Sequence, residues 1–258
     1  MSCAKEAIKL GPQNIVDSLA ERHILIWAEQ NNGRPAGVSL EVLQKACELA
    51  GDSDKVTAAL IGEDCRDAAS ELVACGAARA FVCEDARLEL YQADAYAKIL
   101  TDLISQTRPS IVLMGSTCIG ADLAPTVAAR LGTGLTAHCT DLYFEFFDGR
   151  EQLVMVVPGW QGNMMVKIIC PERRPVMATI RPGIFERSRP DRSRKGEVAT
   201  VKPEIDERDF RARTLERVME GGESSLEQAC VIVSGGFGFF ESKGFALLEE
   251  LARAIGGI

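Results

Sequence analysis

Two glycine-rich loops contain the residues whose types and spacing best suit a chemical role, namely the binding of an anionic ligand. In the first loop, "MGSTCIGADLAPTVAARLG", Gly115 to Gly120 stand between an apolar run and a helical pattern. We expect Asp122 to cap that helix and Pro125 to lie in its first turn. The free N–H groups of such a helix start can bind an anion. A tight turn that only closes the sheet explains these residues equally well.

The second loop, "SGGFGFFESKG", repeats this arrangement near the end of the sequence. We expect a strand at Val231 to Val233 before it and a helix from Gly244 to Ile255 after it. Gly235, Gly236 and Gly238 would let the backbone approach a pyrophosphate. The spacing is G-G-x-G, which lacks the full dinucleotide-binding pattern, and the first loop lacks the Lys-Ser/Thr pair of a Walker A motif. Neither loop identifies a ligand by spacing alone.

Other kinds of chemistry are not indicated. The nine cysteines are scattered and never form a C-x-x-C pair, and the two histidines are far apart in sequence. This pattern predicts neither a disulfide framework nor a metal site, so we expect buried, reduced thiols. His138 and Cys139 are adjacent, but neighbours in a strand point to opposite faces. We therefore expect no catalytic residues of this chain's own.

Composition excludes further classes of function. The sequence has 258 residues, of which 47% are hydrophobic, and it carries 29 Lys and Arg against 37 Asp and Glu. A net charge of −8 argues against a nucleic-acid partner. No apolar run is long enough to span a membrane, and Glu6 and Asp17 interrupt the first twenty residues. We expect a cytoplasmic protein with no membrane and no nucleic-acid contact.

The elements that must position the two loops follow from alternating strand and helix patterns. We expect strands at 24–28, 56–61, 80–83 and 111–114, and helices at 39–50, 65–75, 94–106 and 123–131. This alternation predicts an α/β domain in which a parallel sheet carries helices on both faces. After Gly134, "LTAHCTDLYF", "LVMVVP", "MMVKIIC" and "PVMATIR" are separated by turns too short for crossover helices, which predicts antiparallel strands at the sheet edge.

The domain organisation is predicted from the same patterns. Residues 1–20 are expected to form a helical arm, and residues 21–203 the α/β domain. The charged stretch "ERSRPDRSRKGEVATVKPEIDERD" is typical of an exposed connector, with a boundary near Pro203. Residues 204–258 are then a linker, a short helix at Thr214 to Glu220 and the first strand and helix of a second, Rossmann-like domain.

Five strings, taken in order, closely resemble the α subunit of electron-transfer flavoproteins. They are "ILIWAEQNNGRPAGVSLEVLQKACELA", "VTAALIG", "IVLMGSTCIGADLAPTVAARLGTGLTAHCTDL", "GNMMVKIICPERRPVMATIRPGIF" and "VIVSGGFGFFESKGFALLEELARAIGG". The resemblance implies a first domain that binds no nucleotide and pairs with a similar β subunit, which holds AMP or a second FAD. It implies a second domain that carries FAD and moves between redox partners such as acyl-CoA dehydrogenases. The chain would be an electron-carrier subunit, acting in an acyl-CoA dehydrogenase or reductase complex, rather than a stand-alone enzyme.

The sequence departs from that family in the second loop. Family members usually have Arg in "SGGRGL" as an FAD contact, and this chain has Phe237. The family also continues where this sequence ends, so the resemblance makes Gly235, Gly236, Phe237 and Gly238 the contacts of an incomplete FAD site. A lone strand and helix cannot support a core of their own. Two alternatives stay open, an adenine-nucleotide enzyme that uses Gly115 to Gly120, and a structural subunit with no redox role.

Overall fold

The structure, a computed structural model, describes residues 22–31, 33–159, 162–216, 218, 226, 229–239 and 244–258. The arm expected at 1–20 lies outside these residues, as do 217, 219 and 220 of the helix expected at Thr214 to Glu220. The described residues of that segment, 214–216 and 218, are not helical, so this helix prediction was wrong for them. The chain divides into two units, Met1–Leu215 (unit 1) and Glu216–Ile258 (unit 2). The sequence-based boundary near Pro203 stays a prediction.

Unit 1 is built on a seven-stranded parallel sheet with the strand order β12-β5-β4-β1-β6-β11-β7. The strands are β1 (His23–Trp27), β4 (Lys55–Gly62), β5 (Arg79–Glu84), β6 (Ile111–Gly115), β7 (Leu135–Cys139), β11 (Val176–Ile180) and β12 (Glu197–Thr200). The helices are α1 (Gly37–Leu49), α2 (Arg66–Ala74), α3 (Ala93–Thr107) and α4 (Cys118–Leu131). A short hairpin, β2 (Gln30–Asn31) with β3 (Arg34–Pro35), precedes α1.

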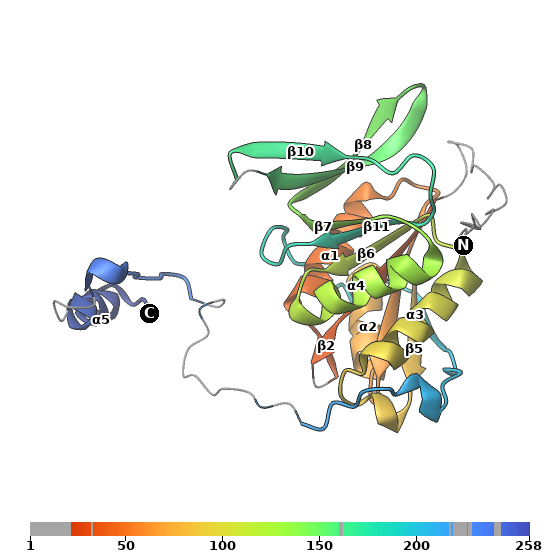
Figure 1. The fold of residues 1–258 in the computed structure, drawn as a ribbon, viewed down its shortest axis with the longest axis horizontal. Coiled ribbons are helices and arrows are strands. Elements are labelled where there is room, and N and C mark those ends of the chain that lie inside the picture. Colours follow the sequence, from red (N-terminus) through yellow and green to blue (C-terminus); the bar gives the residue numbers. More distant parts are fainter. Residues whose placement is uncertain are drawn as a thin grey trace, which may run out of the picture. The chain divides into compact units, whose positions relative to one another are not determined.

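Apolar residues on both faces of the strands form two cores. In β1, Ile24 and Ile26 pack with side chains from α1 and α2, whereas Leu25 and Trp27 pack with side chains from α3 and α4. Side chains alternate across a strand, so a continuous apolar run buries both faces. Figure 1 shows α3 and α4 side by side over one face of the sheet. The predicted fold class, a parallel sheet with helices on both faces, is confirmed.

The four late strings contain five strands, and the prediction of antiparallel strands was wrong for β7 and β11. β7 and β11 are parallel neighbours inside the main sheet. Of these late strands, β8 (Asp141–Phe147), β9 (Arg150–Gly159) and β10 (Met164–Ile168) are antiparallel, and they form a separate three-stranded sheet, drawn at the top of Figure 1. Parallel neighbours need a long connection. Here the small sheet, in place of a helix, provides the connection from β7 to β11.

The charged stretch that we predicted to be an exposed connector contains a strand. β12 pairs in parallel with β5, and Glu197 lies opposite Arg79 in the register. The Arg79 guanidinium and the Glu197 carboxylate form an ion pair at 2.5 Å. Charged side chains are common on edge strands. Because this stretch is rich in charged residues, the sequence pattern did not predict the strand.

In unit 2 the described residues include the 3-10 helix η5 (Phe237–Phe239) and the helix α5 (Gly244–Ile255). The strand expected at Val231 to Val233 is not formed. Instead, the Val233 N–H donates to the Ile258 carbonyl at 2.8 Å, and the Ile258 N–H donates to the Val231 carbonyl at 3.1 Å. A strand needs a partner strand for a ladder, and in the described part of unit 2 this segment pairs only with Ile258.

No described helix of the chain is long and apolar enough to cross a membrane.

Candidate functional site

The carboxyl edge of the main sheet has a topological switch point between β1 and β6. β4 and β5 follow β1 on one side, and the chain then crosses to β6 on the other side. In open α/β sheets, ligands bind outside the carboxyl ends of the strands at such a point. The first glycine loop lies here, because it joins β6 to α4.

Thr117, and not Asp122, caps α4. The Gly120 N–H donates to Thr117 Oγ1 at 3.0 Å, and the Thr117 hydroxyl donates to Glu29 Oε2 at 2.6 Å. Asp122 lies within the helix, where its carboxylate accepts from the Tyr91 hydroxyl at 2.6 Å. Pro125 is inside α4 rather than in its first turn. Threonine is a common N-cap residue, so this signal was present in the sequence at position 117.

The space beside this loop is filled by the protein itself. A Cβ on Gly115 would lie 2.7 Å from Val38 Cγ2, and a Cβ on Gly120 would lie 1.9 Å from the Gly115 carbonyl oxygen. The Glu29 carboxylate stands at the N-terminus of α4, where an anionic ligand would otherwise be favoured. The glycines therefore allow the helix to approach the strand. This geometry argues against the alternative of a nucleotide enzyme at Gly115 to Gly120.

His138 and Cys139 do not act as a pair. His138 is exposed at φ 59°, and its Nδ1 lies 2.7 Å from Ser116 Oγ. Cys139 is fully buried, its Sγ donates to the Thr136 carbonyl, and burial raises the pKa of its thiol to about 12. Burial also raises the thiol pKa of Cys65 and Cys83 to about 12. Cys118 and Cys230 are exposed, which corrects the expectation that the thiols are buried.

The second glycine loop is more open than the first. A Cβ on Gly235 would lie 2.4 Å from Leu248 Cδ1 of α5, so this glycine allows the loop to pack against the helix. A Cβ on Gly236 or on Gly238 would meet no atom of the described residues within 4 Å. The side chain of Phe237 is 86% exposed. Two of the four predicted site residues thus have open space beside their backbone, as far as the described residues show.

The described residues of this loop do not by themselves fit the pyrophosphate of FAD. The loop offers backbone groups at Gly236 and Gly238, but Phe237 brings an apolar ring and no charge. Charge-assisted hydrogen bonds from Arg or Lys strengthen the binding of a phosphate group, and Phe237 supplies none. We therefore derive no chemical step through a flavin from these residues.

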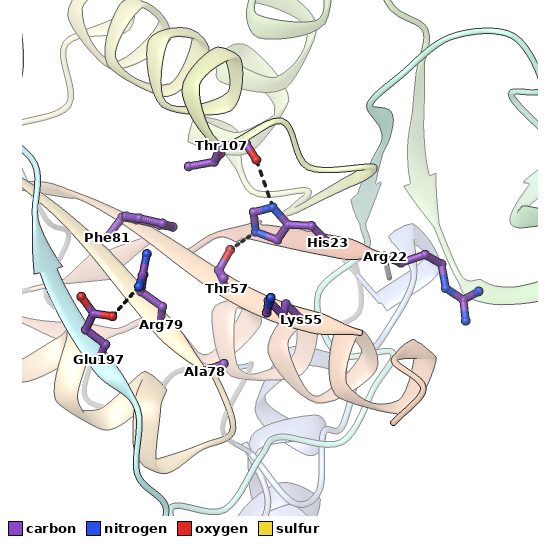
Figure 2. Close-up of a pocket in the computed structure, with 9 residues that line it drawn as sticks. All are labelled: Arg22, His23, Lys55, Thr57, Ala78, Arg79, Phe81, Thr107 and Glu197. Carbon is purple, nitrogen blue, oxygen red and sulfur yellow. Dashed lines mark hydrogen bonds and ion pairs between the residues drawn. The ribbon is translucent and has the colours of Figure 1, made fainter. Parts of the chain in front are cut away.

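A pocket of about 510 Å³ lies at the opposite, amino edge of the main sheet (Figure 2). It is lined by Arg22, His23, Lys55, Thr57, Ala78, Arg79, Phe81, Thr107 and Glu197. His23 Nε2 lies 2.7 Å from Thr57 Oγ1, and its Nδ1 lies 3.3 Å from the Thr107 carbonyl oxygen. These residues are dispersed along the sequence, which explains why no spacing predicted them.

The two arginines of this pocket already have acidic partners. Arg79 pairs with Glu197 within the pocket. Arg22 pairs with Asp54 and Glu151, and Figure 2 shows its side chain pointing away from His23. The site also lies at the edge of the sheet where parallel α/β folds do not place their ligands. We assign it no ligand.

Comparison with known proteins places this geometry in a class. Residues 24–206 match the model of the electron transfer flavoprotein domain. The electron transfer flavoprotein subunit alpha of Megasphaera elsdenii is 41% identical over 244 residues, covering 93% of this chain and 72% of that protein. The protein FixB of Clostridium saccharobutylicum is 38% identical over 236 residues, covering 91% and 70%. The acryloyl-CoA reductase electron transfer subunit beta of Anaerotignum propionicum is 33% identical over 269 residues, covering 94% and 73%.

The fold and these matches define a subunit of a flavin-dependent electron carrier. This chain belongs to the electron-transfer flavoprotein α-subunit family. The resemblance of the five sequence strings is thereby confirmed, and so is the electron-transfer role with a partner subunit.

Proposed function

We propose that this chain pairs with an electron-transfer flavoprotein β subunit and that the complex carries electrons on FAD from an acyl-CoA dehydrogenase-like flavoenzyme. A cytoplasmic location, and AMP or a second FAD held by the β subunit, belong to the same proposal. The name of the Anaerotignum propionicum relative, an electron transfer subunit of an acryloyl-CoA reductase, supports a CoA-thioester enzyme as the redox partner. The described loop at Gly235 to Gly238 supports a flavin site that needs further groups.

The observation that supports pairing with a β subunit is an apolar face of the small sheet that extends beyond the core of unit 1. On the small sheet, Leu142 and Met155 lie opposite each other and are buried in the core of unit 1. Ile168 lies opposite Met155 on β10, and Val166 and Met164 continue the same face. These last two side chains are 40% and 55% exposed. The face is thus buried at the row of Leu142 and Met155 and open towards Met164 on β10.

The other end of the same face is also exposed. Phe146 follows Phe144 by two residues on β8, so both lie on this face. Phe144 packs against the core, whereas Phe146 is 71% exposed. Exposed apolar side chains that continue a core commonly mark a protein–protein interface. We call Phe146, Met164 and Val166 the open apolar face, and its chemistry fits an apolar surface on the β subunit.

The pairing is tested by co-expression of this chain with a β subunit and measurement of the mass of the purified complex. We expect Val166→Glu to weaken the complex at least about tenfold, because a carboxylate would be buried against apolar groups. Met165→Glu is the matched control, since Met165 is 56% exposed but points to the opposite face of β10. Equal effects of both variants would exclude the open apolar face as the binding surface.

The flavin part of the proposal is tested by visible absorbance. We expect the chain purified alone to show little or no flavin, because Phe237 offers no charge to the phosphates. We expect flavin in the co-purified complex, and FAD and AMP can be separated and quantified after denaturation. Stoichiometric FAD on the chain alone would show that the site is complete. A complex without flavin would contradict the proposed function.

A further inference from the structure

The segment that begins with β12 and leads to unit 2 is attached to the main sheet and to α3 as far as Thr214. We call residues 197–215 the strap. Its first part, β12, forms a parallel ladder with β5, and the Val201 N–H continues the pairing by donating to the Val82 carbonyl at 2.9 Å. The strap therefore begins as the edge strand of the main sheet.

The middle of the strap is held by burial. Phe210 is 8% exposed and belongs to the core formed by α3 and α4. Val201 and Ile205 pack against the same core. The guanidinium carbons of Arg87 and Arg213 lie 5.3 and 5.5 Å from the centre of the Phe210 ring. A buried aromatic side chain of this kind strengthens attachment through the apolar area that it removes from water.

The end of the strap is held by a buried amide. Gln92 is 7% exposed, its Oε1 accepts from the Thr214 N–H at 3.0 Å, and its Nε2 donates to the Thr214 carbonyl at 3.4 Å. The Thr214 hydroxyl donates to the Tyr91 carbonyl at 2.7 Å. Arg211 binds both carboxylate oxygens of Asp94, at 2.5 and 3.2 Å. The Gln92 side chain thus provides hydrogen-bond partners for both the N–H and the carbonyl of Thr214, as a neighbouring strand would.

The attachment ends directly after Thr214. Leu215 is 89% exposed, and the division between the two units follows it. Gln92 is the N-cap residue of α3, but its side chain makes no capping hydrogen bond to that helix. Both hydrogen-bonding groups of the amide are therefore used on the strap.

We propose that Gln92 and Thr214 form a latch that fixes where unit 2 is tethered, and that the strap stays on unit 1 when unit 2 changes position. Gln92 is then a positioning residue for electron transfer, an inference that rests on the proposed function. Release of residues 211–215 would lengthen the tether by up to about 17 Å, at roughly 3.4 Å per extended residue. A longer tether lowers the effective concentration of a tethered group.

The latch is tested by hydrogen–deuterium exchange on the chain in complex with a β subunit. We expect the Thr214 amide, which donates to Gln92, to be protected, and Gln92→Leu to raise its exchange about tenfold while α3 is unchanged. Arg211→Ala removes the contacts between the strap and Asp94 of α3, and so tests the same attachment by a substitution in the strap. Arg208→Ala is the control, because Arg208 lies in the strap with its side chain 93% exposed. An unprotected strap, or one that Gln92→Leu does not release, would overturn the latch.

The positioning role of Gln92 is tested separately, by the rate of electron transfer. In the flavin-loaded complex, we expect Gln92→Leu and Arg211→Ala to change the rate of electron transfer to an acceptor flavoenzyme at least about threefold, with the flavin content unchanged. Gln92→Glu keeps the oxygen that accepts from the Thr214 N–H and should restore part of the rate. Release of the strap without a change in rate would overturn the positioning role. A complex that lacks flavin would contradict the proposed function, while the exchange data would still test the latch.

Discussion

The two glycine loops have similar sequences and different surroundings. In the loop at Gly115 to Gly120, the protein supplies its own hydroxyl cap from Thr117 and its own carboxylate from Glu29. In the loop at Gly235 to Gly238, one glycine packs against Leu248, and Gly236 and Gly238 have open space beside them among the described residues. Glycine-rich loops that precede a helix therefore do not by themselves identify a ligand site. What stands opposite each glycine decides between close packing and room for a ligand.

The largest expected effect is for Gly120→Ala in the first loop. The new Cβ would lie 1.9 Å from the Gly115 carbonyl oxygen, and backbone atoms cannot move aside as a side chain can. We expect a loss of about 3 kcal/mol or more in the free energy of unfolding, measured by urea denaturation. Gly236→Ala in the second loop is the matched control and should change stability by less than about 0.5 kcal/mol. Similar losses in both variants would remove the distinction between the loops.

An intermediate effect is expected for Gly235→Ala. Its Cβ would meet Leu248 Cδ1 at 2.4 Å and the Phe239 ring at 3.2 Å. Both contacts are to side chains, so the cost should be about 1–2 kcal/mol. Hydrogen–deuterium exchange of α5 should speed up in this variant and stay unchanged in Gly236→Ala. Unchanged exchange in both variants would mean that the loop does not depend on its packing against α5.

Phe237→Arg tests whether the second loop has room for a ligand. Phe237 is 86% exposed, so the longer side chain fits without displacing the core, and it brings the charge that phosphate binding favours. We expect flavin to bind the complex with the β subunit about tenfold more tightly, as measured by fluorescence titration. Phe237→Gln also removes the aromatic ring but adds no charge, and it should give little gain. Equal gains would attribute the effect to the loss of the aromatic ring.

The parts of the fold that were predicted correctly are those set by local pattern. α3 was expected at 94–106 and spans Ala93–Thr107, because its apolar period and its length act locally. The strand directions of β7 and β11 and the edge strand β12 were missed, because pairing depends on contacts distant in sequence. Spacing did not predict Gln92 and Thr214 either, since their link spans 122 positions.

In the candidate site, too, local sequence pattern did not predict the contacts that single residues make with distant parts of the chain. The sequence located both glycine loops but placed the cap of α4 at Asp122, beyond the true cap at Thr117. Aspartate and threonine both cap helices well, so propensity alone could not choose between them. Thr117 is also bound by Glu29, whose carboxylate accepts from its hydroxyl across 88 positions, a contact that no local pattern predicts.

The smallest expected effect is for Glu29→Gln, which tests the electrostatic part of the comparison. Glutamine keeps an oxygen that can accept from the Thr117 hydroxyl, so the substitution removes the charge at the N-terminus of α4 and little else. We expect a loss of about 0.3–1 kcal/mol in the free energy of unfolding at low salt, and a smaller loss at high salt because the interaction is screened. Val38 still packs against Gly115 in this variant, so AMP should show no saturable binding by calorimetry. Saturable AMP binding by Glu29→Gln would mean that the carboxylate alone excludes an anion from the first loop, and the two loops would then differ by one charge rather than by packing.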